Sequence, residues 1–489
     1  MSILTRRNFL RTTAVVASAA FLSPLARAAG ANDDVRIGMV GFRSRGKNHL
    51  QEYAKLKGVR VVALCDVDQE VLQTEAKAFA DRNEKVETYT DIRKLLENKD
   101  IDAISVATPN HWHSLIGIWA CQAGKDVYLE KPVSHNIWEG RQLVEAARKY
   151  NRIVQTGSQC RSNPGIRDAV DYIQSGALGK IKSVHGCCYK RRDTIGKVEG
   201  EQKVPASVDY DLWTGPAPLE PLHRKALHYD WHWVWPTGNG DLGNQGVHQM
   251  DIARWILKAG ALSPKILSIG GRLGYSDDGT TPNTQLIYHG YEQAPLIFEV
   301  RGLPEKTGSK EMPEYKGVKI GVVTQCENGS VVMPSYTIAM AYDSKGAEIK
   351  RFGYAEGKNG KPEIVSGNHF QNFLDAVRSR KTSDLNAEIQ EGHLSAALCH
   401  TANISYRSGS PATPDEVKAI IKSNADIGEA YSRMEDHLAQ NNINLRESKL
   451  TLGAFLEMDP KTEFFTNNEK ANELLTREYR APFVVPKSV

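Results

Sequence analysis

Residues 35–68 read VRIGMVGFRSRGKNHLQEYAKLKGVRVVALCDVD, and the order of apolar and glycine residues in this stretch decides the fold of the first domain. The pattern predicts a strand, a turn, a helix and a second strand, over residues 35–40, 41–46, 47–56 and 59–64. Two strands joined by a helix in this way form a βαβ unit, in which the strands run parallel. The stretch therefore predicts an α/β domain built on a parallel sheet.

The turn at residues 41–46 and the acid at Asp66 indicate a dinucleotide site. Gly41 permits the tight turn, and Gly46 lets helix and strand approach closely. The helix N-terminus offers backbone N–H groups to a pyrophosphate, so we expect contacts from Gly41, Phe42, Arg43, Ser44, Arg45 and Gly46. Asp66 would accept hydrogen bonds from the ribose hydroxyls and repel a 2′-phosphate, which favours NAD over NADP.

Arg43 departs from the usual glycine pattern, because it stands where such turns carry their middle glycine. Its guanidinium can pair with a phosphate of the dinucleotide. It can also bind a 2′-phosphate, which would favour NADP instead. Both interpretations stay open on the sequence.

Strand and helix patterns keep alternating as far as residue 157. They predict helices at 91–97, 114–123 and 137–150 and strands at 103–107, 126–129 and 152–156. Ligands of parallel sheets bind beyond the carboxyl ends of the strands, where the sequence places Thr108–His113 and Glu130–Pro132. Loops that merely cap the following helices are the alternative. We assign residues 34–157 to a Rossmann dinucleotide-binding domain.

After residue 157 the predicted strands follow one another in series, which favours an α+β domain with a large, mostly antiparallel sheet. Strands are expected at 181–190, 265–273, 284–288, 296–300, 318–323 and 335–341. Helices at 165–175, 369–379 and 389–407 would pack on this sheet or on the first domain. We assign residues 158–410 to this second domain and 411–489 to a C-terminal extension.

Three further motifs, taken together with the glycine turn, resemble those of a known protein family. ATPNHWH at 107–113, EKPVS at 130–134 and GNGDLGNQGVHQMD at 238–251 follow the glycine turn in this order. Together they resemble the Gfo/Idh/MocA oxidoreductases, over roughly residues 34–410. The resemblance implies a nicotinamide-dependent enzyme that acts on a sugar or a related polyol.

The resemblance also implies roles for single residues. Lys131 would face the nicotinamide and hold the reacting hydroxyl, and His248 would take the hydroxyl proton as general base. The family often has an aspartate where this chain has Asn244, which could orient the imidazole but could not stabilise its charged form. Further contacts to the cofactor are expected from Thr108, Pro109, Asn110, His113 and Glu130. Each residue also has a structural alternative. Lys131 could be a surface lysine, His248 a core histidine and His113 the cap of the following helix.

An aromatic cluster precedes the His248 motif. Trp231, Trp233 and Trp235 alternate, so in an extended chain they would face one side, where sugar C–H faces can stack. An aromatic core beneath a long loop is the alternative. At the end of a predicted strand, Tyr189, Arg191 and Arg192 are further candidates for the substrate pocket.

The bulk properties exclude some classes of function. Sixty-two basic and 58 acidic residues leave a net charge of +4 without a long basic stripe, so no nucleic-acid partner is expected. The seven cysteines show no metal-ligand spacing, so we predict no metal site and mostly buried free thiols. An open sheet face in the second domain would favour a homo-oligomer, a dimer or a tetramer.

Residues 1–28 have the features of an export signal. Arg6-Arg7 with Phe9-Leu10, a short apolar stretch and Ala26-Arg27-Ala28 resemble a twin-arginine signal with its cleavage site. An ordinary secretory signal or an anchoring helix is the alternative. The prediction is a periplasmic or exported protein with no membrane segment after cleavage, which leaves the cytoplasm folded and already loaded with cofactor.

The sequence leaves three hypotheses about function, two of them enzymatic and one non-catalytic. The first is a dehydrogenase that oxidises a ring hydroxyl of a sugar or glycoside. The second is an NAD-dependent glycosidase that works by transient oxidation, elimination, hydration and re-reduction. Free NAD is expected to be scarce outside the cytoplasm, so either enzyme would hold and recycle its cofactor. The third is a sugar-binding protein that has kept the fold.

Overall fold

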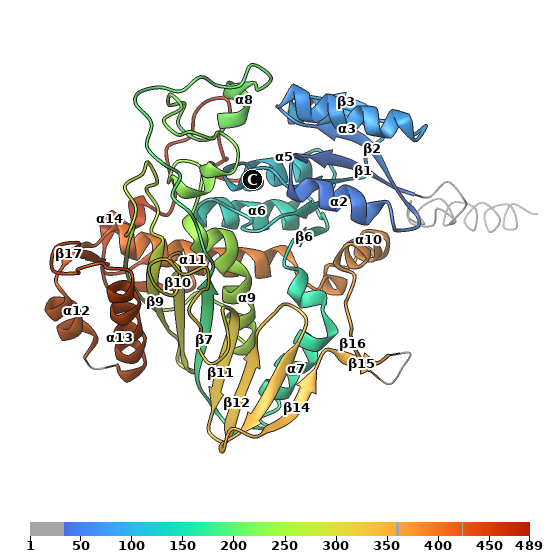
Figure 1. The fold of residues 1–489 in the computed structure, drawn as a ribbon. Helices are drawn as coiled ribbons and strands as arrows, with labels where there is room; N and C mark the ends of the chain where they lie inside the picture. Colours follow the sequence, from blue (N-terminus) through green and yellow to red (C-terminus); the bar gives the residue numbers. More distant parts are fainter. Residues whose placement is uncertain (1–33, 358–360, 423) are drawn as a thin grey trace, which may run out of the picture.

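The computed structural model describes residues 34–357, 361–422 and 424–489. The predicted export signal at residues 1–28 lies outside these ranges. Two sheets dominate the fold, one in the upper and one in the lower half of the view (Figure 1). Among the described residues, no helix is long and apolar enough to span a bilayer.

The first domain contains a six-stranded parallel sheet in the order β3-β2-β1-β4-β5-β6. Its strands are β1 (Val35–Val40), β2 (Val59–Cys65), β3 (Glu87–Tyr89), β4 (Ala103–Val106), β5 (Asp126–Leu129) and β6 (Val154–Thr156). Its helices are α2 (Arg45–Tyr53), α3 (Gln69–Asp81), α4 (Ile92–Glu97), α5 (His113–Gln122) and α6 (Ile137–Lys149). The central strands β4 and β5 are fully buried, as expected for strands covered on both faces. The predicted Rossmann fold is confirmed.

Strand order places the ligand crevice of this domain. β1 pairs with β2 on one side and with β4 on the other, so the strand order reverses there. Ligands of open parallel sheets bind at this switch point, beyond the carboxyl ends of the strands. The glycine turn follows β1, and the loops that begin at Thr108 and Glu130 follow β4 and β5.

Two glycines fix the turn after β1. Gly41 has a φ of 73°, and a side chain there would also meet the backbone of Thr108. A Cβ on Gly46 would lie 2.1 Å from the carbonyl oxygen of Gly41. The absence of a side chain at Gly46 therefore lets α2 pack against the turn. α2 begins at Arg45, two residues before the start of the predicted helix.

The second domain contains the large, mostly antiparallel sheet that the sequence predicts. Its order is β14-β13-β12-β11-β7-β10-β9-β8-β18-β17, and only β7 and β10 pair in parallel. The main strands are β7 (Ile181–Tyr189), β8 (Lys265–Gly271), β9 (Thr284–Gly290), β10 (Pro295–Arg301), β11 (Ile320–Cys326), β12 (Gly329–Met333), β13 (Ala339–Asp343) and β14 (Glu348–Phe352). A small hairpin lies apart from it, formed by β15 (Tyr354–Glu356) and β16 (Pro362–Ile364).

Helices cover one face of the large sheet and connect it to the first domain. α7 (Pro164–Gln174), α9 (Val247–Ile256) and α11 (Ile389–Arg407) bury their apolar residues in the main core. α11 also packs against α6, and α10 (His369–Ser379) packs beneath the first sheet through Phe370 and Phe373. A short helix, α8 (Tyr210–Thr214), lies at the top of the view, to the left of β3 and α3 (Figure 1).

The C-terminal extension, for which the sequence suggested no role, is part of both domains. β17 (Ser410–Ala412) and β18 (Leu450–Leu452) lengthen the large sheet, joined at its edge by β19 (Leu456–Asp459) and β20 (Phe464–Phe465). α12 (Pro414–Ile421) and α13 (Ala425–Gln440) pack over β8, β9 and β10. After α14 (Glu469–Glu473) the tail reaches the first domain, where Phe483 and Val485 join its core.

The tail supplies a testable contribution to stability. Phe483 is 1% exposed and packs edge-on against Trp112 at a ring distance of 5.4 Å. Phe483→Ala should lower the free energy of unfolding by about 3 kcal/mol or more, the usual effect of emptying a buried phenylalanine site. The matched control is Phe464→Ala in the same extension, because Phe464 is 50% exposed. Urea unfolding of both variants checks this, and equal losses would contradict the packing of the tail.

Candidate active site

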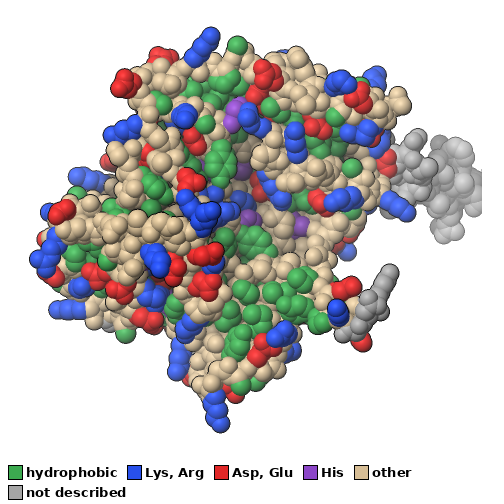
Figure 2. Space-filling view, in the orientation of Figure 1, with side chains coloured by type: hydrophobic (Ala, Val, Ile, Leu, Met, Phe, Trp, Pro, Cys, Tyr) green, Lys and Arg blue, Asp and Glu red, His purple; other side chains and the backbone are tan. Residues whose placement is uncertain are grey.

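A cleft of about 800 Å³ lies between the carboxyl edge of the first sheet and the second domain. Its volume is within the range of small-molecule sites. Sixteen of the candidate residues named from the sequence line it: Gly41, Phe42, Arg43, Ser44, Arg45, Asp66, Thr108, Pro109, Asn110, His113, Glu130, Lys131, Arg192, Trp231, Asn244 and His248. Histidine side chains are visible between the two domains in Figure 2.

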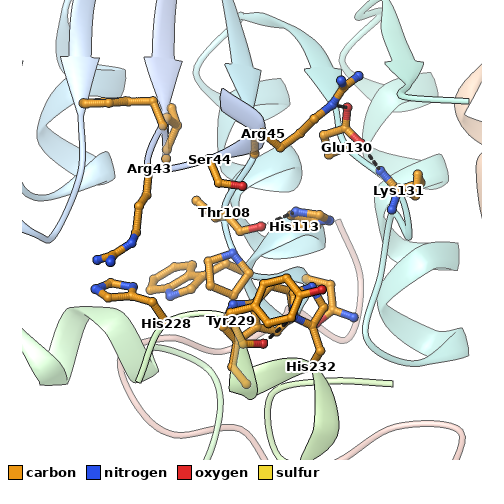
Figure 3. A pocket seen from close by; sticks show the side chains of 18 of the residues that line it. Arg43, Ser44, Arg45, Thr108, His113, Glu130, Lys131, His228, Tyr229 and His232 are labelled. Atoms are coloured by element: carbon orange, nitrogen blue, oxygen red, sulfur yellow. Dashed lines mark hydrogen bonds and ion pairs between the residues drawn. The ribbon is translucent and has the colours of Figure 1, made fainter. Parts of the chain in front are cut away.

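The glycine turn forms one wall of the cleft. Arg43 and Ser44 point from it toward the open space, whereas Arg45 extends along the wall to Glu130 (Figure 3). Phe42 contributes its backbone only, because its side chain is buried among Met39, Leu50 and Leu64. Gly46 does not line the cleft, since it faces the turn itself. The N-terminus of α2 thus opens toward the cleft, as a pyrophosphate site requires.

Asp66 lies at the end of β2 and lines the cleft. One of its carboxylate oxygens accepts the Phe42 amide at 3.1 Å, and the other accepts the Asp68 amide at 3.0 Å. Burial raises the pKa of Asp66 to about 6. Each oxygen keeps acceptor capacity, because a carboxylate offers about four acceptor sites. The residues present therefore fit the ribose of NAD.

Arg43 is paired rather than free. Its guanidinium lies 3.6 Å from the Asp68 carboxylate, which also contacts His228 of the second domain at 3.1 Å. A 2′-phosphate bound here would therefore face both Asp66 and Asp68. Of the two interpretations of Arg43, this geometry disfavours the binding of a 2′-phosphate.

Residues 204–233, here named the cover segment, close the adenosine end of the cleft. The backbone of the segment bonds to the stretch between β2 and α3, with Gln69 donating to Ser207 at 2.8 Å and Asp209 donating to Val67 at 3.1 Å. Leu212 and Trp213 of this segment line the cleft together with Val67 and Ile92 of the first domain. The second domain thereby covers a site built by the first.

At the opposite end of the cleft, Glu130 binds several side chains. It is buried and accepts hydrogen bonds from Arg45 at 2.9 Å, His49 at 3.0 Å and Gln159 at 3.2 Å. Burial alone would raise the pKa of this carboxyl, but Arg45 and His49 hold it well below its ordinary value. Glu130 therefore acts on the cofactor wall by holding Arg45 in place.

Lys131 reaches from this loop into the second domain. Its ammonium donates to the carbonyl oxygen of Asn244 at 2.7 Å. Burial lowers the pKa of Lys131, and the nearby Glu130 carboxylate partly offsets this effect. The Asn244 carbonyl belongs to a π-helical turn, Leu242–Gly246, directly before α9. Such turns interrupt the regular bonding of a helix and recur at functional sites.

His248 stands on the first turn of α9 and is 8% exposed. Among the described residues its Nδ1 has no hydrogen-bond partner. Burial lowers the pKa of His248 to about 3, and the charge of Lys131 adds to this effect. The imidazole is therefore neutral at ordinary pH and can accept a proton. Asn244 lines the cleft beside it and contributes its backbone oxygen to Lys131; a role of its side chain in orienting the imidazole stays a prediction.

His113 and Asn110 connect the loops around the cleft. The two ring nitrogens of His113 contact the carbonyl oxygens of Pro132 and Thr108, at 2.6 and 2.8 Å. Asn110 donates to the side chain of Asn239 at 2.5 Å. Thr108 keeps a buried hydroxyl that has no partner among the described residues. Both His113 and Asn110 thus hold the cleft walls in place.

Two of the three tryptophans lie outside the cleft. Residues 230–233 form a 3₁₀-helix instead of the extended chain that the alternation assumed, so Trp231 and Trp233 face different ways. Trp233 is buried beneath Arg192, 5.1 Å from its guanidinium carbon. Trp235 packs against Tyr406 and Arg407. Of the predicted stacking surface, only Trp231 remains in the cleft, with His228, Tyr229 and His232 (Figure 3).

Tyr189 and Arg191 also lie outside the cleft. Cys188 faces the helices, whereas Tyr189 is buried on the opposite face of the sheet, beside Arg301. Arg191 is exposed and pairs with Asp193. Since side chains alternate along a strand, Lys190 and Arg192 face the cleft instead. Sequence reasoning missed Lys190, together with Gln245 and Tyr336, which also line it.

Solved structures share this architecture. A levoglucosan dehydrogenase in complex with NADH and levoglucosan superposes with a TM-score of 0.55 at 19% identity, covering 75% of this chain and 95% of that one. The WlbA dehydrogenase from Bordetella pertussis, in complex with NADH and UDP-GlcNAcA, gives 0.54 at 18% identity, covering 75% and 94%. At these identities the likeness shows the fold.

Sequence relatives include a levoglucosan dehydrogenase from Pseudarthrobacter phenanthrenivorans, 26% identical over 46% of this chain and 51% of the relative. A glycosyl hydrolase family 109 protein from Shewanella baltica is 30% identical over 37% of this chain and 44% of the relative. The chain thus spans about half the length of the curated relatives it matches.

Two family profiles match in sequence order. The profile of an oxidoreductase family with an NAD-binding Rossmann fold matches residues 35–158, and that of the C-terminal alpha/beta domain of the same family matches residues 167–299. Together they cover more than half of the chain. The chain therefore belongs to the Gfo/Idh/MocA oxidoreductase family, with an NAD-binding Rossmann domain followed by the family's alpha/beta domain.

Proposed function

We propose that the protein is an NAD(H)-dependent oxidoreductase that acts on a ring hydroxyl of a sugar or glycoside. The observation that carries the proposal is that a buried, neutral His248 and the Lys131 ammonium both line one end of a cleft whose other end fits a dinucleotide. The relatives named levoglucosan dehydrogenase and glycosyl hydrolase family 109 protein support a carbohydrate substrate.

Each side chain has a defined task in this reaction. Lys131 donates to the oxygen of the reacting hydroxyl and stabilises the negative charge that develops on it. His248 accepts the hydroxyl proton, because its imidazole is neutral and its Nδ1 is free among the described residues. Bound NAD supplies the acceptor for the hydride that leaves the carbon. Arg45 and Asp66 hold the pyrophosphate and the ribose.

We further propose that the cofactor stays bound through many turnovers. The cover segment spans the adenosine end and is bonded to the stretch between β2 and α3 on the other wall, so release of NAD requires those bonds to open. A retained cofactor also suits export of the folded chain by the predicted twin-arginine signal, since free NAD is expected to be scarce outside the cytoplasm.

The second candidate function is the NAD-dependent glycosidase, which the likeness to glycosyl hydrolase family 109 proteins favours. Elimination would need a base for a carbon-bound proton. Tyr336 lies next to His248, with a ring distance of 5.0 Å. Burial raises the pKa of its hydroxyl, which keeps Tyr336 protonated and makes it a poor base. Hydride transfer needs only Lys131 and His248, whereas elimination needs a further base, so the dehydrogenase is the preferred proposal.

The cofactor can be identified in the exported protein. After cell fractionation, the chain from the periplasm should release NAD(H), and little NADP(H), on denaturation, because Asp66 and Asp68 face the adenosine ribose end. Mass spectrometry of the released nucleotide measures this. A variant with Arg6→Lys and Arg7→Lys should stay in the cytoplasm with the same nucleotide. Release of mainly NADP would contradict the preference for NAD, and export of that variant would contradict the twin-arginine signal.

The two proposed catalytic groups can be tested by substitution. Lys131→Ala and His248→Ala should each lower kcat by about 10²-fold or more, the usual contribution of a positioned acid–base group. The His248 variant should keep its cofactor, because the imidazole makes no contact with the dinucleotide wall. His223→Ala is the control, since His223 is exposed and distant from the cleft lining. Near-normal turnover by His248→Ala would exclude it as the base.

The reaction class can be decided with an activated aryl glycoside in heavy water. A dehydrogenase should release no phenol, and an added keto-sugar should reoxidise the bound NADH. A glycosidase would release phenol without net reduction and place deuterium on the carbon next to the oxidised one, because elimination exchanges that proton with solvent. Phenol release with deuterium in the product would establish the second candidate in place of the first.

A further inference from the structure

The end of β7 delivers two cationic side chains to the substrate end of the cleft. Lys190 and Arg192 follow Cys188 at intervals of two residues, so all three face the helix side of the sheet. Lys190 is partly buried, and its ammonium donates to the side-chain oxygen of Gln245 at 3.0 Å. Neither the proton transfer to His248 nor the binding of NAD uses Lys190.

Lys190 and Lys131 are held by consecutive residues of one turn. Lys131 donates to the backbone oxygen of Asn244, and Lys190 donates to the side chain of Gln245. The amide of Gln245 is in turn fixed by a hydrogen bond to Tyr336. An ammonium has three N–H donors, and each lysine uses one of them within the protein. Both keep donors for a ligand.

The arginines of the cleft all have acidic partners. Arg192 binds both oxygens of Asp241, at 2.9 and 2.6 Å. Arg45 pairs with Glu130 and Arg43 with Asp68. By contrast, no carboxylate among the described residues lies within 4.0 Å of the ammonium of Lys131 or Lys190. The substrate end thus carries two positive charges that the protein does not pair.

One of these charges has a task in the proposed reaction, and the other has none. Lys131 would stabilise the oxygen of the reacting hydroxyl, which starts the reaction neutral. A partly buried cation is more costly to desolvate when no opposite charge accompanies it. Lys190 would obtain that charge from the ligand.

We propose that the sugar substrate of this site carries an anionic group, a carboxylate or a sulfate, and that Lys190 binds this group beside the reacting hydroxyl. The inference rests on the proposed function for the presence of a sugar. It assigns specificity to Lys190 and leaves the proton transfer to His248. A carboxylate or sulfate accepts from an ammonium through a charge-assisted hydrogen bond, which is stronger than a bond between neutral groups.

The test compares acidic and neutral sugars on the mature protein with its bound cofactor. The probes are the methyl glycosides, in both anomers, of glucuronate, galacturonate, glucose 6-sulfate, glucose and galactose. Calorimetry or a change in NADH fluorescence gives the dissociation constants. At least one acidic probe should bind about tenfold more tightly than its neutral counterpart, as expected for one hydrogen bond to a charged group. The uronates and the sulfate then tell which anion is preferred.

Lys190→Gln should abolish this preference and leave the affinity for neutral glycosides within about twofold. Arg191→Gln is the matched control, because it removes the same charge from the neighbouring residue, which points away from the cleft. The comparison within the unsubstituted protein remains decisive if Lys190→Gln fails to fold. Equal binding of acidic and neutral probes, or no binding of any acidic probe, overturns the proposal.

The outcomes separate this inference from the proposed function. If neutral glycosides are oxidised and acidic ones do not bind, the oxidoreductase stands and the role of Lys190 is wrong. If acidic glycosides bind through Lys190 and are neither oxidised nor cleaved, the specificity stands and the proposed reaction is wrong. A Lys190→Gln variant that loses affinity for both kinds of probe equally would show that Lys190 only supports the Gln245 turn, which also overturns the inference.

Discussion

The hydrogen bond from the Lys131 ammonium to the Asn244 carbonyl joins the two domains at the point where the chemistry is expected. It ties the loop after β5 to the turn before α9, and therefore fixes Lys131 relative to His248. The bond needs a carbonyl that regular helix bonding would use, and the π-helical turn at 242–246 provides one. It acts together with other contacts between the domains, such as the hydrogen bond from Asn110 to Asn239.

The two ends of the cleft hold their cationic side chains with different kinds of acceptor. At the dinucleotide end, buried carboxylates bind the arginines. Glu130 accepts hydrogen bonds from three side chains, one of which is Arg45. At the substrate end the lysines are held by neutral oxygens of the turn. A cation held by a neutral acceptor keeps most of its field, whereas one paired with a carboxylate is largely neutralised. The substrate end is consequently the electropositive one.

Local patterns predicted the first domain well, because a parallel sheet buried on both faces produces apolar runs that periodicity detects. Several predicted element bounds there, such as 35–40 and 126–129, agree with the structure, although α3 and β3 were not predicted. The glycine turn, Asp66 and the loops at Thr108 and Glu130 were placed from strand order alone. Their chemical roles remain predictions until the substitutions above are made.

The substrate end was harder to predict because long-range contacts shape it. Whether Tyr189 or Lys190 faces the cleft depends on which face of β7 the helices cover, and the adjacent Cys187 and Cys188 give no indication of this. The three tryptophans suggested an extended chain, but residues 230–233, at the end of the cover segment, form a short 3₁₀-helix. The π-helical turn at 242–246 contacts a lysine more than a hundred residues earlier, and local sequence patterns do not detect such a contact.

The cover segment has a thermodynamic consequence. It belongs to the second domain but bonds to the first, so any molecule enclosed beneath it contacts both. A ligand that binds only the folded form adds stability as the logarithm of its concentration over its dissociation constant. The two domains are thus linked through their ligand as well as through their own contacts. A melting temperature measured on this protein is accordingly a property of the complex, and it shifts with the fraction of molecules that hold a dinucleotide.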